Sequence, residues 1–192
     1  MDWEQRVARA EERHRDGSDR LPDDGEDTEA LEAVLPGEPP ERYVQRVTGL
    51  KLDAALARLE RRGLPAAPVL CSDTTVALGR TVYGKPQDAQ DAGRMLRELS
   101  GKTHRVLTAI AIQHGRKRRQ ALSESRVTFA RMTPAQIRAY VASGEPLGKA
   151  GAYAVQGRAA AHISHISGSY SGIMGLPMHE TALLLRAFGI EA

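Results

Sequence analysis

Two segments with strand character, residues 105–112 and 122–129, lie on either side of a polar turn that contains Gly115. Their apolar composition and the short turn between them predict a β-hairpin. Helical patterns occur both before and after this hairpin. A chain in which strands and helices alternate, with one hairpin among them, predicts an α/β fold with a mixed sheet rather than a purely parallel one.

Prolines and glycines mark the bounds of the predicted helices. A proline pair that begins at Pro39 starts a long helix, and Gly63 ends it, because proline suits the first helical turn and glycine the end of a helix. A further helix is expected to start at Asp88 or Asp91 and to end at Gly101, and two more are expected over residues 133–144 and 177–188. The helix over residues 133–144 begins with Thr-Pro-Ala-Gln, which is typical of a capping box.

Asp73 follows a short apolar segment, residues 69–71, that predicts a buried strand ending at Ser72 and Asp73. After a turn, residues 76–82 predict a second strand. An aspartate at the end of a strand lies where α/β proteins usually place ligands. Its carboxylate can hold a divalent metal or accept a proton from water. The alternative is a turn aspartate that binds its own backbone.

Length and charge exclude several classes of protein. The chain has 192 residues and a formal net charge of +3, with both signs interspersed. This suits a polyanionic small molecule and does not demand nucleic acid. Cys71 is the single cysteine, which excludes an internal disulfide and fits a reducing compartment. No apolar run approaches the roughly 20 residues of a membrane span. We therefore expect a cytoplasmic protein with no membrane partner.

Three charged side chains are candidates for a site that binds phosphate or metal. Lys85 stands in Gly-Lys-Pro, a loop that proline stiffens and glycine lets bend. Lys51 lies near the apolar face of the long helix, so it points either to solvent or into a site. Glu32 lies in a locally apolar run, where it can help to coordinate a metal or simply be solvated.

A glycine-rich stretch, residues 143–157, contains Lys149, Tyr153 and Gln156, three side chains able to hold a polar ligand. The Gln156 amide offers a donor and an acceptor together, which suits the edge of a pyrimidine or a positioned water. The alternatives are that Gln156 braces the loop and that Lys149 pairs with Glu145. The histidines lack partners at metal-ligand spacing, so we expect no zinc site.

The order of these motifs is more specific than any one of them. Glu-Pro-Pro-Glu-Arg-Tyr-Val is followed by Lys51, Asp73-Thr-Thr-Val, Gly84-Lys-Pro, Ser-Gly-Lys-Thr-His-Arg-Val and the glycine-rich stretch. Over residues 30–190 or so, this order resembles the Maf family of nucleoside triphosphate pyrophosphatases. The resemblance implies an elongated, mixed-sheet α/β fold of the Maf/ITPase type, with an active-site cleft between two lobes.

The resemblance also implies an activity. It predicts a cytoplasmic hydrolase that splits dTTP, UTP and modified pyrimidine nucleotides into the monophosphate and pyrophosphate. It further implies a divalent cation, Mg²⁺ or Mn²⁺, and a homodimer. Thr74, directly after the aspartate, matches the dTTP- and UTP-hydrolysing branch. The candidate site residues are Asp73, Lys85, Lys51 and Glu32 for catalysis, Thr74, Gln156 and Lys149 for substrate binding, and Asp73 and Glu32 for the metal.

The family's N-terminal strand and its Ser-x-Ser-Pro-Arg-Arg loop have no counterpart in this sequence. We expect residues 1–28 to form an atypical, flexible segment and residues 29–192 to form the Maf-like pyrophosphatase domain. Without the loop arginines, a second hypothesis stays open, namely a non-catalytic, regulatory protein that binds nucleotide without hydrolysing it. A third, stable binding of nucleic acid through the basic residues 116–119, is disfavoured because no aromatic stacking residues accompany those charges.

Overall fold

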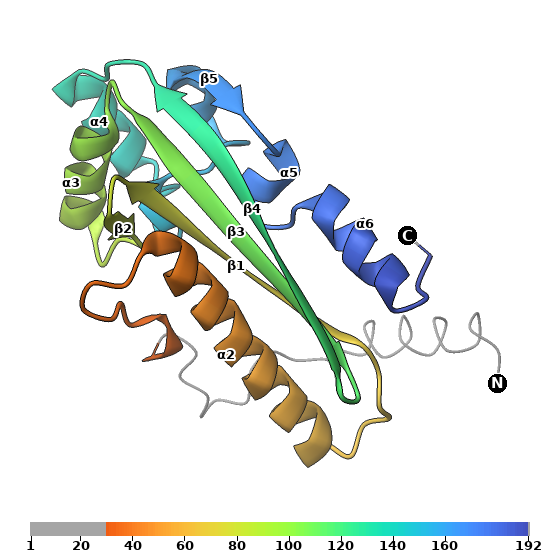
Figure 1. Cartoon of the computed structure of the whole chain (residues 1–192). Helices are drawn as coiled ribbons and strands as arrows, with labels where there is room; N and C mark the ends of the chain where they lie inside the picture. The colour runs from red at the N-terminus through yellow and green to blue at the C-terminus, as the bar shows by residue number, and fades with distance from the viewer. Residues whose placement is uncertain (1–29, 192) are drawn as a thin grey trace. The chain divides into compact units, whose positions relative to one another are not determined.

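The computed structural model describes residues 30–191, and Figure 1 shows how their helices and strands are arranged. The N-terminal segment expected over residues 1–28 lies outside this range. In chain order the elements are η1 (Ala30–Glu32), α2 (Pro40–Arg61), β1 (Val69–Leu78), β2 (Thr81–Tyr83), α3 (Ala89–Leu99), β3 (Thr103–His114), β4 (Lys117–Phe129), α4 (Pro134–Ala142), η2 (Ala150–Ala152), η3 (Arg158–His162), β5 (Ile163–Ser167), α5 (Tyr170–Ile173) and α6 (Met178–Ala187).

The strands form one sheet in the order β2-β1-β3-β4-β5, which confirms the α/β class. The predicted hairpin is confirmed, because β3 and β4 pair from Thr103 opposite Thr128 to His114 opposite Lys117. Every strand pair within residues 30–191 is antiparallel, rather than a mixture of both directions. The short strand β2 explains this, because it already runs opposite to β1 before the chain crosses through α3 and returns as β3 beside β1.

Strand β1 differs from its prediction. It runs without a break from Val69 to Leu78, and its pairing with β3 continues residue by residue from Val69 to Ala77. Asp73 therefore lies in the middle of a strand and not at its end. The polar residues at positions 72–75 resembled a turn in the sequence, but threonine favours strands and this segment pairs fully on its β3 side. The true turn follows Leu78, at Gly79, whose φ is 62°.

The helix boundaries follow the signals in the sequence. Proline occupies the first turn of α2, and Gly63, with φ 59°, lies just beyond its end. At the start of α4, the Thr133 side chain accepts a hydrogen bond from the backbone of Gln136, whose side chain binds back to the Thr133 backbone. The predicted capping box is therefore confirmed.

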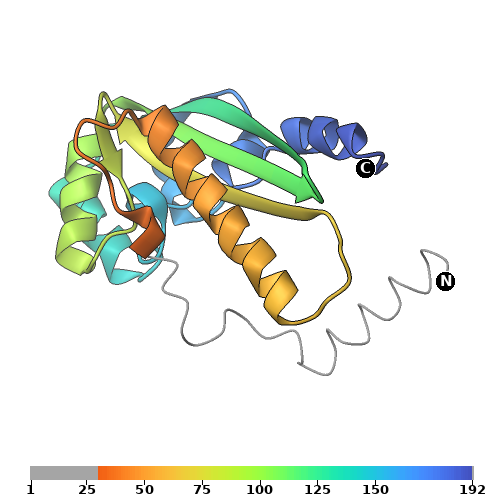
Figure 2. The ribbon, with the colours of Figure 1, turned by 60° about the horizontal axis from the view of Figure 1, so that its bottom comes forward.

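The sheet has helices on both faces. Helix α2 lies along one face, where it contacts β1 and β3, as Figures 1 and 2 show. Its apolar side buries Tyr43, Val44 and Val47 against the sheet. The other face packs against α3, α4 and η2 in a second cluster that includes Val76 and Phe129. Because successive side chains of a strand point to opposite faces, neighbouring residues of β1 reach two different environments.

Candidate active site

The outer edge of β1 is open along part of its length. Within residues 30–191, β2 pairs with β1 only from Val76 to Leu78, so no strand covers positions 72–75 on that side. A pocket of about 310 Å³ lies at this open edge. All seven predicted site residues line it, namely Glu32, Lys51, Asp73, Thr74, Lys85, Lys149 and Gln156.

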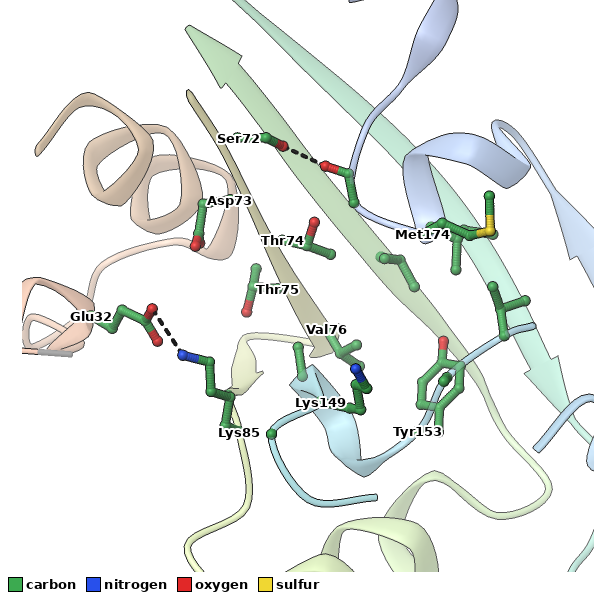
Figure 3. A pocket seen from close by; sticks show the side chains of 18 of the residues that line it. Glu32, Ser72, Asp73, Thr74, Thr75, Val76, Lys85, Lys149, Tyr153 and Met174 are labelled. Carbon is green, nitrogen blue, oxygen red and sulfur yellow. Dashed lines mark hydrogen bonds and ion pairs between the residues drawn. The ribbon is translucent and has the colours of Figure 1, made fainter. Parts of the chain in front are cut away.

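One end of the pocket is charged. The Nζ of Lys51 on α2 lies 2.7 Å from Oε1 of Glu32 and 2.5 Å from Oδ1 of Asp73. The Nζ of Lys85, in the loop after β2, lies 3.3 Å from the same Oε1 of Glu32 (Figure 3). Segments far apart in the sequence thus bring two lysines and two carboxylates together. Lys51 points into the site, and Glu32 is a partner of both lysines and not merely solvated.

Burial and ion pairing set the proton affinities of this cluster. Burial raises the pKa of the Asp73 carboxyl above its usual range, and the hydrogen bond and charge of Lys51 offset only part of this effect. Burial also acts to raise the pKa of Glu32, but the bonds and charges of Lys51 and Lys85 outweigh it and hold that pKa below its usual range. Burial acts to lower the pKa of Lys51. The hydrogen bonds and charges of Asp73 and Glu32 outweigh burial, so the pKa of Lys51 is raised.

The donor set of this end fits a hard divalent cation that binds together with a ligand. No group of three or more His, Cys, Asp or Glu side chains gathers as a metal site in the described part of the chain. Mg²⁺ usually takes one or two carboxylates and completes its shell with water and substrate phosphates. Asp73 and Glu32 are two such carboxylates. Both already accept a hydrogen bond from the same positively charged group, the Lys51 ammonium, so they lie close enough together to share one cation.

Thr75 is a pocket residue that the sequence interpretation missed. It is 1% exposed, and its Oγ1 has no hydrogen-bond partner among the described residues. It lies on the same face of β1 as Asp73, two residues away, and Figure 3 shows both on the side of the strand that faces Glu32 and Lys85. A buried hydroxyl without a partner is costly, and it invites a ligand atom. Its place inside the Thr-Thr motif was the only signal in the sequence.

The other end of the pocket is mostly uncharged, and Lys149, beside Val76 and Tyr153, is the charged side chain that Figure 3 shows there. Thr74 and Val76 lie on the opposite side of β1, toward Tyr153 and Met174 (Figure 3). The wall there includes the apolar side chains of Val106, Val155 and Ile173. Gln156 also lines the pocket and is exposed. Within residues 30–191, the Gln156 amide makes no hydrogen bond to another side chain or to the backbone, so the alternative of a bracing role finds no partner there.

The glycine-rich stretch forms the wall facing β1. Gly151 has φ 67°, and a Cβ on it would lie 2.8 Å from Cγ2 of Val76. Its N–H donates to the Gly84 carbonyl at 3.0 Å, which ties the wall to the loop that holds Lys85. Only glycine allows both this backbone conformation and this close approach.

The alternative in which Lys149 only pairs with Glu145 is wrong for the described residues. Glu145 instead accepts from the Tyr140 hydroxyl at 2.8 Å and from the Arg158 backbone at 3.0 Å. Its carboxylate thereby ties helix α4 to the first residue of η3. Lys149 is exposed and lines the pocket, and its ammonium has no hydrogen-bond partner among the described residues.

A buried aromatic group supports Tyr153. The Nε2 of His104 lies 2.8 Å from the Tyr153 hydroxyl, and both rings pack edge-on against Phe129. Burial lowers the pKa of His104 to about 4, so this imidazole is neutral near pH 7. The packing fixes the Tyr153 ring as a rigid wall of the pocket. The sequence interpretation saw no partner for His104, since its partner lies on a distant segment.

The fold and the pocket define an α/β protein with one pocket that has a cluster of paired charges at one end and mostly uncharged walls at the other. The sequence model of the family described as "Maf-like protein" matches residues 17–188. The chain belongs to this family. It is 74% identical over 171 residues to a protein of Albidiferax ferrireducens named dTTP/UTP pyrophosphatase, a match that covers 89% of this chain and 86% of that protein.

Further relatives carry the same name. A dTTP/UTP pyrophosphatase of a Polaromonas species is 73% identical over 166 residues, covering 86% of this chain and 82% of the relative. One of Cupriavidus metallidurans is 62% identical over 171 residues, covering 89% and 86%. Among the described residues, no helix is both long and apolar enough to cross a membrane.

Proposed function

We propose that this chain is a nucleoside triphosphate pyrophosphatase that hydrolyses dTTP and UTP to the monophosphate and pyrophosphate. One observation supports this most directly. A single pocket joins a cluster of two lysines and two carboxylates to an end with mostly uncharged walls, and the two ends lie on opposite sides of one strand. A nucleotide has the same two parts, a polyanion and a flat neutral base. The names of the relatives support the choice of substrate.

The charged end supplies the groups that cleavage of a phosphoanhydride requires. Lys51 and Lys85 place positive charge where negative charge builds up on the phosphate oxygens, and fixed charges of this kind stabilise the transition state. Asp73 lies beside Lys51 with a raised pKa, which suits a group that accepts the proton of an attacking water. Glu32 holds both lysines in place. Thr75 offers its unpartnered hydroxyl to a phosphate oxygen or to that water.

A divalent cation is part of the proposal. Asp73 and Glu32 are the residues that would hold Mg²⁺ or Mn²⁺, and the cation would neutralise charge on the phosphates of the bound nucleotide. The homodimer and the cytoplasmic location remain predictions from the resemblance.

The test is turnover of dTTP and UTP by the purified protein with Mg²⁺ or Mn²⁺, with the monophosphate and pyrophosphate both measured. We expect Asp73→Asn to lower kcat by about 100-fold or more, the usual contribution of a general base. The matched control is Asp53→Asn, because Asp53 is an exposed aspartate of α2 that pairs with Arg118 outside the pocket.

Two results would contradict the proposal. Full activity in the Asp73→Asn variant would exclude this carboxylate as the proton acceptor. Nucleotide binding by the folded wild-type protein, without any release of pyrophosphate, would instead support the alternative of a non-catalytic nucleotide-binding protein.

A further inference from the structure

The mostly uncharged end of the pocket contains a chain of hydroxyl groups that the proposed function leaves unexplained. Thr74 on β1 lies directly opposite Thr108 on β3, and their Oγ1 atoms are 2.9 Å apart. Thr108 in turn lies 2.7 Å from the carbonyl oxygen of Gly172 in α5. Thr108 is 1% exposed, whereas Thr74 is half-buried and lines the pocket.

The direction of the protons in this chain follows from chemistry. A carbonyl oxygen only accepts, so a contact of 2.7 Å to Gly172 requires the Thr108 hydroxyl to donate. Each hydroxyl has one proton to give. Thr108 therefore has none left for Thr74, and Thr74 must be the donor in the contact between the two threonines. The proton of Thr74 is committed to the interior, and only its acceptor capacity remains for a ligand in the pocket.

We propose that Thr108 determines base specificity by acting through Thr74, which it fixes as a pure hydrogen-bond acceptor toward the bound base. This inference rests on the proposed function. It assigns the base to the end near Thr74 and Val76, because the paired cluster of Lys51, Lys85, Asp73 and Glu32 occupies the other side of β1. An acceptor-only group favours a base that presents an N–H there and disfavours one that presents a lone pair.

The pyrimidines differ in this respect. Uracil and thymine present an N–H at position 3, and cytosine presents an unprotonated nitrogen at the same position. Thr74 can accept from the first two bases, but it faces cytosine with lone pair against lone pair. A site built for one hydrogen-bonding pattern rejects the analogue that lacks it, because buried polar groups are left unpaired. Thr108, which never touches the base, thereby selects UTP and dTTP over CTP.

The experiment compares kcat/KM for UTP and CTP in the wild-type protein and in Thr108→Val. Valine keeps the shape and removes the acceptor of the Thr74 proton, so Thr74 becomes free to turn and donate. The Gly172 carbonyl keeps a second donor, the Gly175 N–H at 3.0 Å, which leaves the wall formed by α5 supported. We expect the ratio of UTP to CTP to fall about tenfold, the scale of one hydrogen bond.

Three further variants separate this role from a structural one. Thr108→Ser keeps the hydroxyl and should keep the ratio. In a Thr74→Val background, adding Thr108→Val should leave the ratio unchanged, because a residue that acts through another has no effect once the other is gone. Thr103→Val is the matched control, since Thr103 and Thr128 form the same cross-strand hydroxyl pair at 2.8 Å outside the pocket.

Two outcomes would overturn the inference. The first is hydrolysis of CTP by the wild-type protein as efficiently as of UTP. This test does not depend on whether any variant folds. The second is an equal loss of both activities in Thr108→Val, with an unchanged ratio, which would assign Thr108 a packing role only. A wild-type protein without UTP hydrolysis would contradict the proposed function itself, so the two failures are distinguishable.

Discussion

The Lys51 ammonium lies between two carboxylates, 2.5 Å from Asp73 on β1 and 2.7 Å from Glu32 at the end of η1. All three side chains are mostly buried, so each depends on the others for its charge. Removal of Lys51 leaves Asp73 without its cationic partner and leaves Glu32 with Lys85 alone, which is more damaging than the loss of an exposed pair.

We therefore expect Lys51→Met to lower kcat/KM for UTP by about 100-fold or more and the free energy of unfolding by about 2 kcal/mol. The pKa values of Asp73 and Glu32 should rise, which moves the acidic limb of the pH–rate profile to higher pH. The control is Arg94→Met on α3, where the arginine also joins two carboxylates, Asp91 and Glu98, but on the surface. Equal effects of both variants on turnover would contradict the assigned role of Lys51.

The raised pKa of Asp73 has a consequence for stability. A carboxyl whose pKa is higher in the folded than in the unfolded chain stabilises the fold at low pH, and this stabilisation is lost as the pH rises through its folded pKa. Asparagine resembles the protonated form at every pH. We expect Asp73→Asn to melt at the same temperature as the wild type near pH 4 and at a higher temperature near pH 8.

Thermal melting from pH 4 to pH 8 measures this difference, with Asp53→Asn as the exposed control. A melting temperature that is lower in Asp73→Asn than in the wild type at pH 8 would mean that the ion pair with Lys51 outweighs burial. Asp73→Asn should also be less active than the wild type, so this substitution is expected to raise stability and lower turnover.

Thr75→Val should also raise stability and lower activity. The substitution removes a buried hydroxyl that has no partner among residues 30–191, and valine suits a strand. We expect the free energy of unfolding to rise by about 1 kcal/mol and kcat/KM for UTP to fall about tenfold. Thr75→Ser retains the hydroxyl and should retain most of the activity. If Thr75→Val is less stable than the wild type, the hydroxyl has a partner within the protein.

Gly151 and Gly148 form a matched pair for a packing test. Both have positive φ, 67° and 72°, but a Cβ on Gly148 would meet nothing within 4 Å, whereas one on Gly151 would meet Val76. We expect Gly148→Ala to cost about 1 kcal/mol of stability from backbone strain alone, and Gly151→Ala about 3 kcal/mol.

Chemical denaturation measures both glycine variants. Adding Val76→Ala to Gly151→Ala should recover part of the loss, because the neighbour that clashes becomes smaller. Equal destabilisation by the two glycine variants would show that strain, rather than the contact with Val76, determines the need for glycine at position 151.

Features with local causes could be predicted from the sequence. The capping box at Thr133, the glycine after α2 and the hairpin of β3 and β4 each depend on residues close together in the chain. The course of β1 could not be predicted in this way. Its polar centre resembles a turn locally, and it is a strand because β3, about thirty residues further on, pairs with it through Asp73.

In the site, too, some residues could be predicted from local motifs and others could not. Asp73, Lys51 and Lys85 were recognisable from motifs, and the structure places them together in one pocket. The roles of Thr75 and Thr108 were not recognisable, because what distinguishes them is the absence or the direction of a hydrogen bond in the folded chain. A threonine in a strand-forming sequence is too common to single out by its type alone.

The edge of β1 that no strand of residues 30–191 covers has a consequence for association between molecules. Alternate residues of an antiparallel strand direct their N–H and C=O groups away from the paired neighbour, and an uncovered edge is a template for pairing with another chain. Between Ser72 and Thr75 the wall of η2 and the charged Lys85 border this edge, so a foreign strand is hindered from docking there. A bound nucleotide would occupy the remaining space, and substrate would then protect the protein against aggregation.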